Sequence, residues 1–391
     1  MGLMEIASPS ILISAVMPCL NEEKTLGICI EKAFRAFANL GVAGEVVVAD
    51  NGSTDGSVEI AQRLGARVVH QPVKGYGAAL QAGCQAANGK YIVMGDSDDS
   101  YDWEAIGAFL PPLENGADLV MGNRFKGGIL PGAMPPLHRY LGNPVLSFIS
   151  RVAFRVPIGD FHCGMRAFRK DAFEKMRPQT MGMEFATELI AAAASSGLSI
   201  KEIPIKLHKD KRGRPPHLRS WRDGWRHLRF IVSYAPDHLY MFPALAMLAL
   251  GLPMQVLLFK GPFESGDLYL GIHFLALGGL LTLLGFNLLT LGVLAKLIVG
   301  VRYPLTMGHG IRRFLRLFTL ERGLILGALL TVTGFLGLLA ILIRWWRVPG
   351  APMADTVHPA FGLTQACVLG VETVFISFLL HLLLSERQVD H

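Results

Sequence analysis

The chain has 391 residues, with 37 basic against 31 acidic side chains and a formal net charge of +6. Its Arg residues gather beside apolar runs, which favours a membrane surface over nucleic acid as the partner for this modest charge. The chain has five cysteines, and because this number is odd it excludes a complete intramolecular disulfide framework and predicts reduced thiols in a cytosolic domain.

The first half of the chain alternates short apolar runs with amphipathic segments, which predicts strands alternating with helices. The first run, 11–17, has no Lys or Arg before it and is followed by Glu22 and Glu23, so we expect a buried strand and not a signal peptide. Such alternation is typical of a mostly parallel sheet that binds ligands at the carboxyl ends of its strands. Further strands are expected at 45–49, 66–70, 91–94 and 118–121, and helices at 23–40, 57–64 and 77–87.

Asp50 leaves the second expected strand and is followed by Gly52 and Ser53. An Asp in this place accepts hydrogen bonds from a base edge or a ribose hydroxyl, and small residues let a ligand approach the backbone. The alternative is an ordinary capped turn into a helix. The later loop 74–80 lacks the third glycine of a dinucleotide fingerprint and any Walker lysine pattern, so we expect a close-approach loop there and not an NAD site.

The fourth expected strand runs into four carboxylates within seven residues, and these would repel each other unless a cation compensates them. Asp96 and Asp98, at i and i+2, can reach one divalent ion across a tight turn. Oxygen ligands favour Mg²⁺ or Mn²⁺ over zinc. The alternative is an acidic surface loop. Asp102 is predicted to cap a helix that begins at Trp103.

Taken together and in this order, the motifs resemble glycosyltransferase family 2, whose members have the GT-A fold. The resemblance is closer to dolichol-phosphate-mannose or -glucose synthases and to bacterial polyprenyl-phosphate glycosyltransferases with membrane anchors. It covers residues 11–235 and departs at Leu20, where the family often has Tyr, and at Asp99-Ser100, where Leu-Gln is common. The resemblance continues through residues 122–125, His138-Arg139, Asp160, residues 164–166, Glu184 and the basic loop 209–214.

The resemblance implies an α/β GT-A catalytic domain with a Rossmann-like mixed sheet and an α-helical transmembrane domain of four spans. It assigns the DXD metal motif to Asp96-Ser97-Asp98 and the nucleotide-contacting Asp to Asp50. The expected catalytic residues are Asp98, Asp96 and Arg139, and the expected metal ligands, for Mg²⁺ or Mn²⁺, are Asp96 and Asp98. The expected nucleotide-sugar contacts are Pro18, Leu20, Glu22, Val48, Asp50, Ser97 and Arg124, and the expected lipid-phosphate contacts are Arg139, Arg212 and Arg214.

The acceptor decides which other groups are needed. A sugar hydroxyl requires a general base, for which Glu184 and Asp160 are candidates. A lipid monophosphate is already largely ionised at neutral pH and needs cationic steering more than a base. The cationic loop before the first apolar run therefore favours polyprenyl phosphate. We expect transfer of a hexose from a UDP- or GDP-linked sugar to this lipid with inversion, and a glycolipid synthase acting on a lipid hydroxyl is the alternative.

The second half carries four apolar runs long enough to cross a bilayer, at about 239–259, 268–299, 324–343 and 361–384. Basic residues in the segments before the first run and between the second and third predict that the catalytic domain faces the cytosol. In the segment 217–235, Trp221 and Trp225 lie beside an Arg stripe, which predicts an amphipathic helix in the headgroup layer. The expected domains are therefore 1–216, this helix, and a membrane domain at 236–391.

Glu372 is the one carboxylate expected deep in the bilayer. It is interpreted either as half of a structural ion pair with Lys296 or as a functional residue. Two rival functions are considered. A processive polysaccharide synthase typically carries Gln-x-x-Arg-Trp, but Ile341 stands where that Gln would precede Arg344-Trp345. A non-catalytic membrane scaffold would be indicated by degenerate acidic loops, yet Asp50, Asp96 and Asp98 are all present. The sequence leaves an oligomeric state open.

Overall fold

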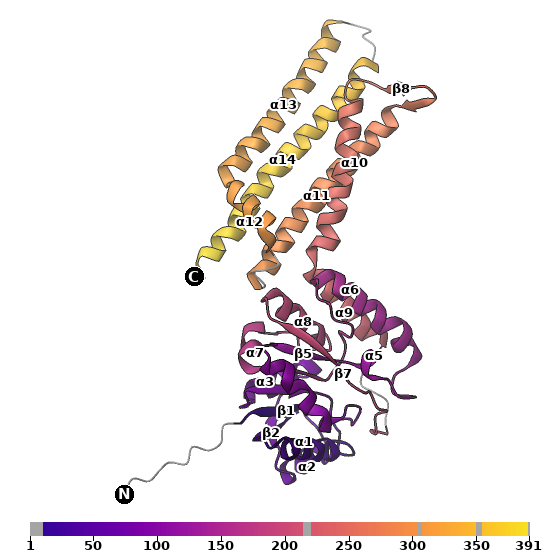
Figure 1. Cartoon of the computed structure of the whole chain (residues 1–391). Helices are drawn as coiled ribbons and strands as arrows, with labels where there is room; N and C mark the ends of the chain where they lie inside the picture. Colours follow the sequence, from indigo (N-terminus) through magenta and orange to yellow (C-terminus); the bar gives the residue numbers. More distant parts are fainter. Residues whose placement is uncertain (1–10, 214–219, 303–306, 349–353, 390–391) are drawn as a thin grey trace. The chain divides into compact units, whose positions relative to one another are not determined.

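A computed structural model describes residues 11–213, 220–302, 307–348 and 354–389 of the chain (Figure 1). The chain divides into two compact units, Met1–Ser233 and Tyr234–His391. The first unit holds a mixed sheet covered by helices, and the second is built from long apolar helices. This arrangement confirms the expected fold class. The boundary lies at the end of the segment that was expected to be a separate interfacial helix.

The sheet of the first unit has seven strands in the order β3-β2-β1-β4-β6-β5-β7. β1 pairs in parallel with β2 and β4, and β2 pairs in parallel with β3, so their carboxyl ends meet at one edge. β6 is antiparallel to both β4 and β5, whereas β5 and β7 are parallel. The strands are β1 (Ile13–Cys19), β2 (Gly44–Asp50), β3 (Arg67–His70), β4 (Tyr91–Met94), β5 (Leu119–Asn123), β6 (Arg166–Arg169) and β7 (Ile200–Pro204).

All five expected strands are present, with ends that differ by at most two residues, but β6 and β7 were not expected. β6 has only two apolar residues between two arginines, too few for a recognisable period. Arg166 is nevertheless fully buried, because its guanidinium donates to the backbone carbonyls of Ala186 and Cys163. The antiparallel strand β6 makes the sheet mixed.

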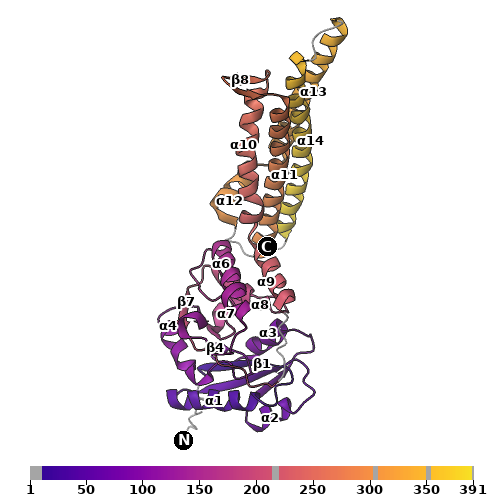
Figure 2. The ribbon, with the colours of Figure 1, turned by 90° about the vertical axis from the view of Figure 1, so that its right-hand side faces the viewer.

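Helices cover both faces of the sheet (Figure 2). Strands buried on both sides, such as β2 with its run of valines, read as continuous apolar segments. The Asp102 carboxylate accepts from the backbone N–H of Glu104 at 3.1 Å, which confirms the expected cap. The helical elements are α1 (Leu26–Leu40), α2 (Ser57–Arg63), α3 (Tyr76–Ala86), η1 (Trp103–Phe109), α4 (Leu110–Glu114), α5 (Arg124–Gly127), η2 (His138–Gly142), α6 (Asn143–Phe154), α7 (Lys170–Met176), α8 (Phe185–Ser195) and α9 (Ser220–Tyr234).

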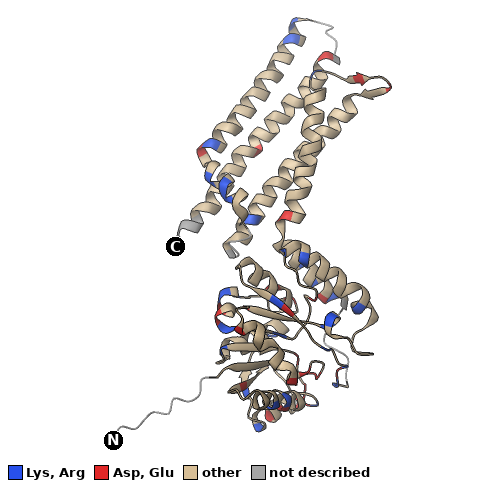
Figure 3. Cartoon of the chain, viewed as in Figure 1, with Lys and Arg blue, Asp and Glu red and all other residues tan. Residues whose placement is uncertain are grey.

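Among the described residues of the second unit, four helical stretches are long and apolar enough to cross a membrane: Asp237–Leu258, Ile272–Val301, Leu320–Arg347 and Asp355–Ser385. Figure 3 shows their charged residues mostly toward the helix ends. The elements are η3 (Asp237–Met241), α10 (Phe242–Leu258), β8 (Phe263–Ser265), β9 (Leu268–Leu270), α11 (Ile272–Arg302), α12 (Gly308–Leu317), α13 (Leu320–Arg347) and α14 (Ala354–Val389).

The second expected span began at 268, but Leu268–Leu270 is a strand paired with β8. Gly261 and Gly266 have positive φ, which lets the chain turn into this hairpin before α11 begins. The expected pair between Lys296 and Glu372 is not formed. The Lys296 ammonium contacts Asp237 at 2.5 Å, and Glu372 accepts from Asn287 at 3.4 Å.

Candidate active site

The candidate site lies where β1, β2 and β4, neighbours in the sheet, end at the same edge. Asn21 and Asp96 lie in the loops after β1 and β4, and Asp50 is the last residue of β2. Next to them is a cleft of about 340 Å³. It is lined by Asn21, Glu22, Glu23, Lys24, Thr54, Asp55 and Arg212. The sheet topology therefore brings together residues far apart in the chain.

Asp50 organises the turn beside this cleft. Its carboxylate accepts from the backbone N–H of Ser53 at 3.0 Å and of Gly52 at 3.2 Å, and His70 Nδ1 lies 3.2 Å away. Burial by itself raises the pKa of Asp50, but the hydrogen bonds from Ser53, His70 and Gly52 bring it below its ordinary value. Asp50 is thus held ionised at the end of β2, with Ser53 Oγ reaching across to the Asn21 backbone N–H at 3.0 Å.

Asp96 and Asp98 lie together on the loop after β4. The Tyr76 hydroxyl donates to Asp96 at 2.9 Å, and Ser97 Oγ donates to the Pro18 carbonyl at 2.7 Å, which ties this loop to the end of β1. Burial and then the neighbouring Asp98 charge raise the pKa of Asp96 to about 6. Asp96 and Asp98 are two neighbouring carboxylates, and Asp96 is harder to ionise than an ordinary Asp. A cation bound beside them would favour the ionised form.

Asp99 takes the left-handed backbone conformation, with φ of +60°. Lys32 and Lys211 each contact the Asp99 carboxylate at 2.7 Å. Burial raises the pKa of Asp99, and the hydrogen bonds from the two lysines bring it below its ordinary value. Asp99 therefore anchors the loop, which leaves Asp96 and Asp98 as the carboxylates available to a cation.

The basic segment 208–213 lies along the acidic loop. The backbone N–H groups of His208 and Lys211 donate to the carbonyls of Ser100 and Asp98 at 2.9 and 3.2 Å. Arg212 Nη2 contacts Asp98 Oδ2 at 2.8 Å, and Arg212 Nη1 lies 3.7 Å from Glu22. Arg212 Nε makes no hydrogen bond among the described residues and lies 3.6 Å from Asp210 Oδ1. The guanidinium therefore stands among three carboxylates, with its shortest contact to Asp98.

The residues present fit a divalent cation. Mg²⁺ and Mn²⁺ take oxygen ligands, and a cation between Asp96 and Asp98 would offset the burial and the carboxylate repulsion that raise the pKa of Asp96. Among the described residues, no group of three or more His, Cys, Asp or Glu side chains is placed to hold a metal. Two carboxylates without a third protein ligand suit an ion that also takes oxygens from water and a substrate phosphate.

Two of the arginines expected at phosphates have other surroundings. Arg124 is buried, and its Nε and Nη2 donate to both Asp160 oxygens at 2.7 and 2.8 Å. Asp160 also accepts from the Arg124 backbone N–H, so it is committed to this pair and poorly suited to act as a base. Arg139 lies on η2, with its guanidinium 5.5 Å from the centre of the Tyr140 ring. Arg214 lies outside the described residues.

The other expected residues divide into two groups. Glu22 and Arg212 line the cleft, and Pro18 and Ser97 hold its loops together. Leu20 lies between Pro18 and the cleft residue Asn21 along the chain. Val48 is buried in the apolar core, so the fold does not bring it to the cleft. These assignments remain predictions.

The sequence analysis did not predict two contacts near the site. Tyr76, at the start of α3, is the partner of Asp96, and a Tyr after a glycine carries no signal for that role. Gly75 and Gly77 do form a close-approach loop, but the approach is to the backbone of residues 180–182: an added Cβ would lie 2.0 Å from the Met181 carbonyl and 2.4 Å from the Thr180 carbonyl. Glu184 follows that segment, and its Oε2 is buried without a hydrogen-bond partner among the described residues.

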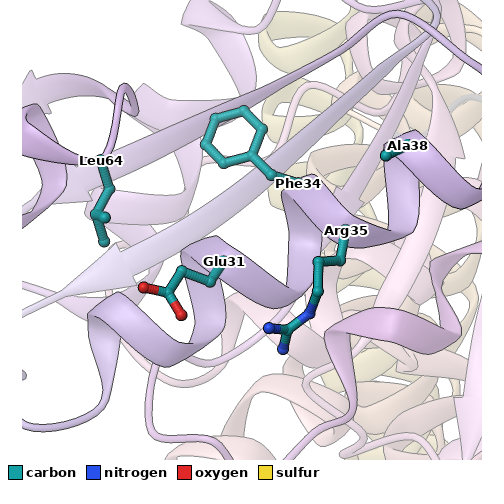
Figure 4. A pocket seen from close by; sticks show the side chains of 5 residues that line it. All are labelled: Glu31, Phe34, Arg35, Ala38 and Leu64. Carbon is teal, nitrogen blue, oxygen red and sulfur yellow. The ribbon is translucent and has the colours of Figure 1, made fainter.

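A second hollow, of about 380 Å³, is shown in Figure 4. It is lined by Glu31, Phe34, Arg35, Ala38 and Leu64. Four of these residues lie on α1, and the fifth follows α2. This hollow lies on helices and contains none of the residues at the strand ends, so it is separate from the candidate site.

Comparison with known proteins agrees with this arrangement. Residues 14–177 match the family described as Glycosyl transferase family 2, and residues 293–384 match the Glycosyltransferase family 2 C-terminal transmembrane region. A low-salt glycan biosynthesis hexosyltransferase of Haloferax volcanii is 40% identical over 375 residues, which cover 94% of this chain and 88% of that protein. The chain belongs to glycosyltransferase family 2. With its four long apolar helices, this glycosyltransferase is an integral membrane protein.

Other relatives match part of the glycosyltransferase. A dolichyl-phosphate hexose transferase of Haloferax volcanii is 33% identical over 193 residues, or 49% of this chain and 81% of that protein. Among solved structures, glucosyl-3-phosphoglycerate synthase from Mycobacterium tuberculosis in complex with Mn²⁺, uridine diphosphate and glucosyl-3-phosphoglycerate is 24% identical, with a TM-score of 0.44, over 57% of this chain and 78% of that chain.

Proposed function

We propose that this glycosyltransferase moves a hexose from a nucleotide sugar to a membrane polyprenyl phosphate. The observation that carries the proposal is the meeting of Asp96 and Asp98 with Arg212 beside one cleft, in a chain that is anchored in a membrane. The names of two relatives, a hexosyltransferase and a dolichyl-phosphate hexose transferase, support the sugar class and the acceptor class.

The paired aspartates would hold Mg²⁺ or Mn²⁺, and such an ion, when bound, offsets the negative charge that gathers on a departing diphosphate. The chain's own residues prepare the site for this. Tyr76 fixes Asp96, the lysines on Asp99 fix the loop, and Asp50 fixes the turn after β2 through the Ser53 backbone N–H. An ionised Asp50 is suited to accept a hydrogen bond from a ribose hydroxyl.

The acceptor chemistry favours a phosphate over a hydroxyl. A phosphate monoester is ionised at neutral pH, so its oxygen can attack the anomeric carbon without a base while the bond to the diphosphate oxygen breaks on the opposite side. The product then has the inverted configuration. Arg212 lines the cleft beside Asp98, its Nε makes no hydrogen bond among the described residues and lies 3.6 Å from Asp210, and a guanidinium matches phosphate oxygens well. We assign Arg212 to phosphate binding on this ground.

A lipid hydroxyl acceptor is the second candidate, and one observation favours it. Glu184 Oε2 is buried without a hydrogen-bond partner among the described residues, and its segment packs on the loop that also carries Tyr76, the partner of Asp96. A carboxylate in that state is a candidate general base.

A matched pair of acceptors separates the two functions. Purified enzyme is given a panel of UDP- and GDP-hexoses with either a polyprenyl phosphate or the corresponding polyprenol, and the lipids are analysed by mass spectrometry. We expect product from the phosphate only, and none with the Asp98→Ala variant. Product from the polyprenol alone would establish the hydroxyl acceptor. Unchanged transfer by Asp98→Ala would overturn the role of the paired aspartates.

A further inference from the structure

One face of the membrane-spanning helix α11 carries a regular row of uncovered residues. α11 packs against α10 and α14, and neither helix covers this row. Its members follow one another at alternating steps of three and four residues, which is the heptad spacing of a coiled-coil seam. All of them are exposed except Leu294, which is partly buried. The row, named here the α11 seam, consists of Leu277, Leu280, Leu284, Asn287, Leu291, Leu294, Ile298 and Val301.

Asn287 is the polar member of the α11 seam and the middle residue of α11. Among the described residues of the four spans it is the one exposed Asn or Gln, since Gln255 is partly buried and Gln365 is buried. Its Nδ2 donates to the Leu283 carbonyl at 3.0 Å and to Glu372 at 3.4 Å, but its Oδ1 accepts no hydrogen bond from the described residues. Acyl chains offer no donor, so a carbonyl oxygen that faces them is costly.

We propose that α11 binds α11 of a second copy of this chain, in parallel and in register, through the α11 seam. All copies in one membrane have the same orientation. A twofold axis along the membrane normal therefore places equal residues of two copies opposite each other. Asn287 then meets Asn287 of the second copy halfway along both helices. One Asn in such a seam fixes the register, because any slip would place both carboxamides against leucines.

The carboxamide is self-complementary, and for this reason a second copy is the occupant. Asn287 Oδ1 accepts from Nδ2 of the second copy, and the exchange is reciprocal. The hydrogen for this bond is the one that points to the Leu283 carbonyl, because that carbonyl keeps its helix bond from the Asn287 backbone N–H. The contact with Glu372 is retained. An unrelated membrane protein has no reason to carry a carboxamide at the same depth.

The apolar members of the α11 seam add close packing to this bond. Side chains with a mean spacing of 3.5 residues interlock between helices that cross at about 20°, the commonest arrangement of helices in membranes. The pairing concerns the membrane unit alone. Its test therefore needs no sugar donor or acceptor, and its failure would leave the proposed transfer reaction untouched.

The experiment measures association of the purified full chain in liposomes of phosphatidylcholine and phosphatidylglycerol. Copies that carry a donor or an acceptor fluorophore at a C-terminal tag are mixed, and Förster transfer is recorded over a range of protein-to-lipid ratios. Asn287→Leu should weaken association by about three- to twentyfold, the range for one hydrogen bond between membrane helices. Thr333→Leu removes an exposed hydroxyl from α13 and is the matched control, so it should associate as the native chain does.

Cysteine cross-linking tests the register on chains that keep Asn287. With copper phenanthroline as oxidant, Leu284→Cys and Leu291→Cys should each cross-link to the same residue of the second copy. Leu336→Cys, which is exposed on α13, should not cross-link. The native chain, whose five cysteines are buried or partly buried, gives the background.

Förster transfer no higher than that of unassociated proteins at every ratio would overturn the proposal and show that lipid covers the α11 seam. Association that Asn287→Leu leaves unchanged would also overturn it. The same conclusion would follow from cross-links at position 336 in place of positions 284 and 291, because another face would then be the interface.

Discussion

Asp96→Asn is expected to stabilise the metal-free enzyme while removing its capacity to bind metal. In the folded protein, burial and the neighbouring Asp98 raise the pKa of Asp96 from 3.8 to about 6. A raised carboxyl pKa means that the folded state disfavours the ionised form, so the free energy of unfolding falls as pH rises from about 4 to about 6 and then stays lower. Asn has the same shape, still accepts from Tyr76, and carries no charge.

The magnitude follows from the two pKa values. A difference of about 2 at 1.36 kcal/mol for each corresponds to about 3 kcal/mol at neutral pH, and the partial exposure of Asp96 makes this an upper limit. For a unit of this size, 1 kcal/mol changes the melting temperature by about 2–4 °C. The variant should therefore melt several degrees higher at pH 7 and no higher near pH 4.

The assay is thermal unfolding of the two detergent-solubilised proteins with chelator and with Mn²⁺, across pH 4 to 8. Mn²⁺ should raise the melting temperature of the native enzyme, because a ligand bound only by the folded state stabilises it. The variant should show no such increase. A variant that melts at or below the native temperature at pH 7 without metal, or one that Mn²⁺ still stabilises fully, would refute the reasoning.

Three further substitutions test separate contacts. Arg212→Gln removes the cation that pairs with Asp98, so transfer should fall while Mn²⁺ binds more tightly in calorimetry, by about tenfold or more. The estimate takes about 1.5 kcal/mol, the lower end for a charged hydrogen bond, and weaker Mn²⁺ binding would contradict it. Gly164→Ala puts a Cβ 2.7 Å from Asp96 Oδ2 and should weaken Mn²⁺ binding about tenfold or more, whereas Gly224→Ala, which meets nothing, should not. Asp160→Asn leaves the buried Arg124 without its counter-ion and should lower the free energy of unfolding by about 3–5 kcal/mol in chemical denaturation. Asp171→Asn, which breaks an exposed pair, is the control and should lower it by less than about 1 kcal/mol. Equal losses would show that the buried pair is not the cause.

The sequence predicted those parts of the site that depend on local order along the chain. Asp50 and Asp96 follow apolar runs, and in a parallel sheet the ends of such runs meet at one edge, so the strand pattern alone placed both residues at one edge. The cap at Asp102 was predicted for the same reason, because a cap and its helix are adjacent in sequence.

Partners distant in sequence could not be predicted. An Arg beside a phosphate site and an Arg in a buried ion pair look the same in a sequence, so the bidentate pair of Arg124 with Asp160 was not foreseen. The same holds for Arg212, which was expected at a lipid phosphate and whose contact with Asp98 was not foreseen. The antiparallel strand β6 was missed because Arg166 is buried through backbone carbonyls that sequence patterns do not show.

The helix α6 shows a further limit of periodicity. The spacing of Val145, Phe148 and Val152 indicates that one face is apolar, but not whether that face points inward or outward. Only the burial of Ser147 and Ser150 decides the direction. Trp221 and Trp225 of α9 are exposed, and the interfacial role expected for segment 217–235 stays a prediction.

The central claim is that the sugar is transferred to a lipid phosphate, and the mass of the lipid product tests it most directly. Membranes that contain the enzyme are incubated with the nucleotide sugar it uses. The mass of the extracted lipid is then measured by mass spectrometry before and after treatment with mild acid. We predict a polyprenol carrying one phosphate and one hexose, from which mild acid releases the hexose. A glycosylated lipid that lacks the phosphate and survives mild acid would contradict the account.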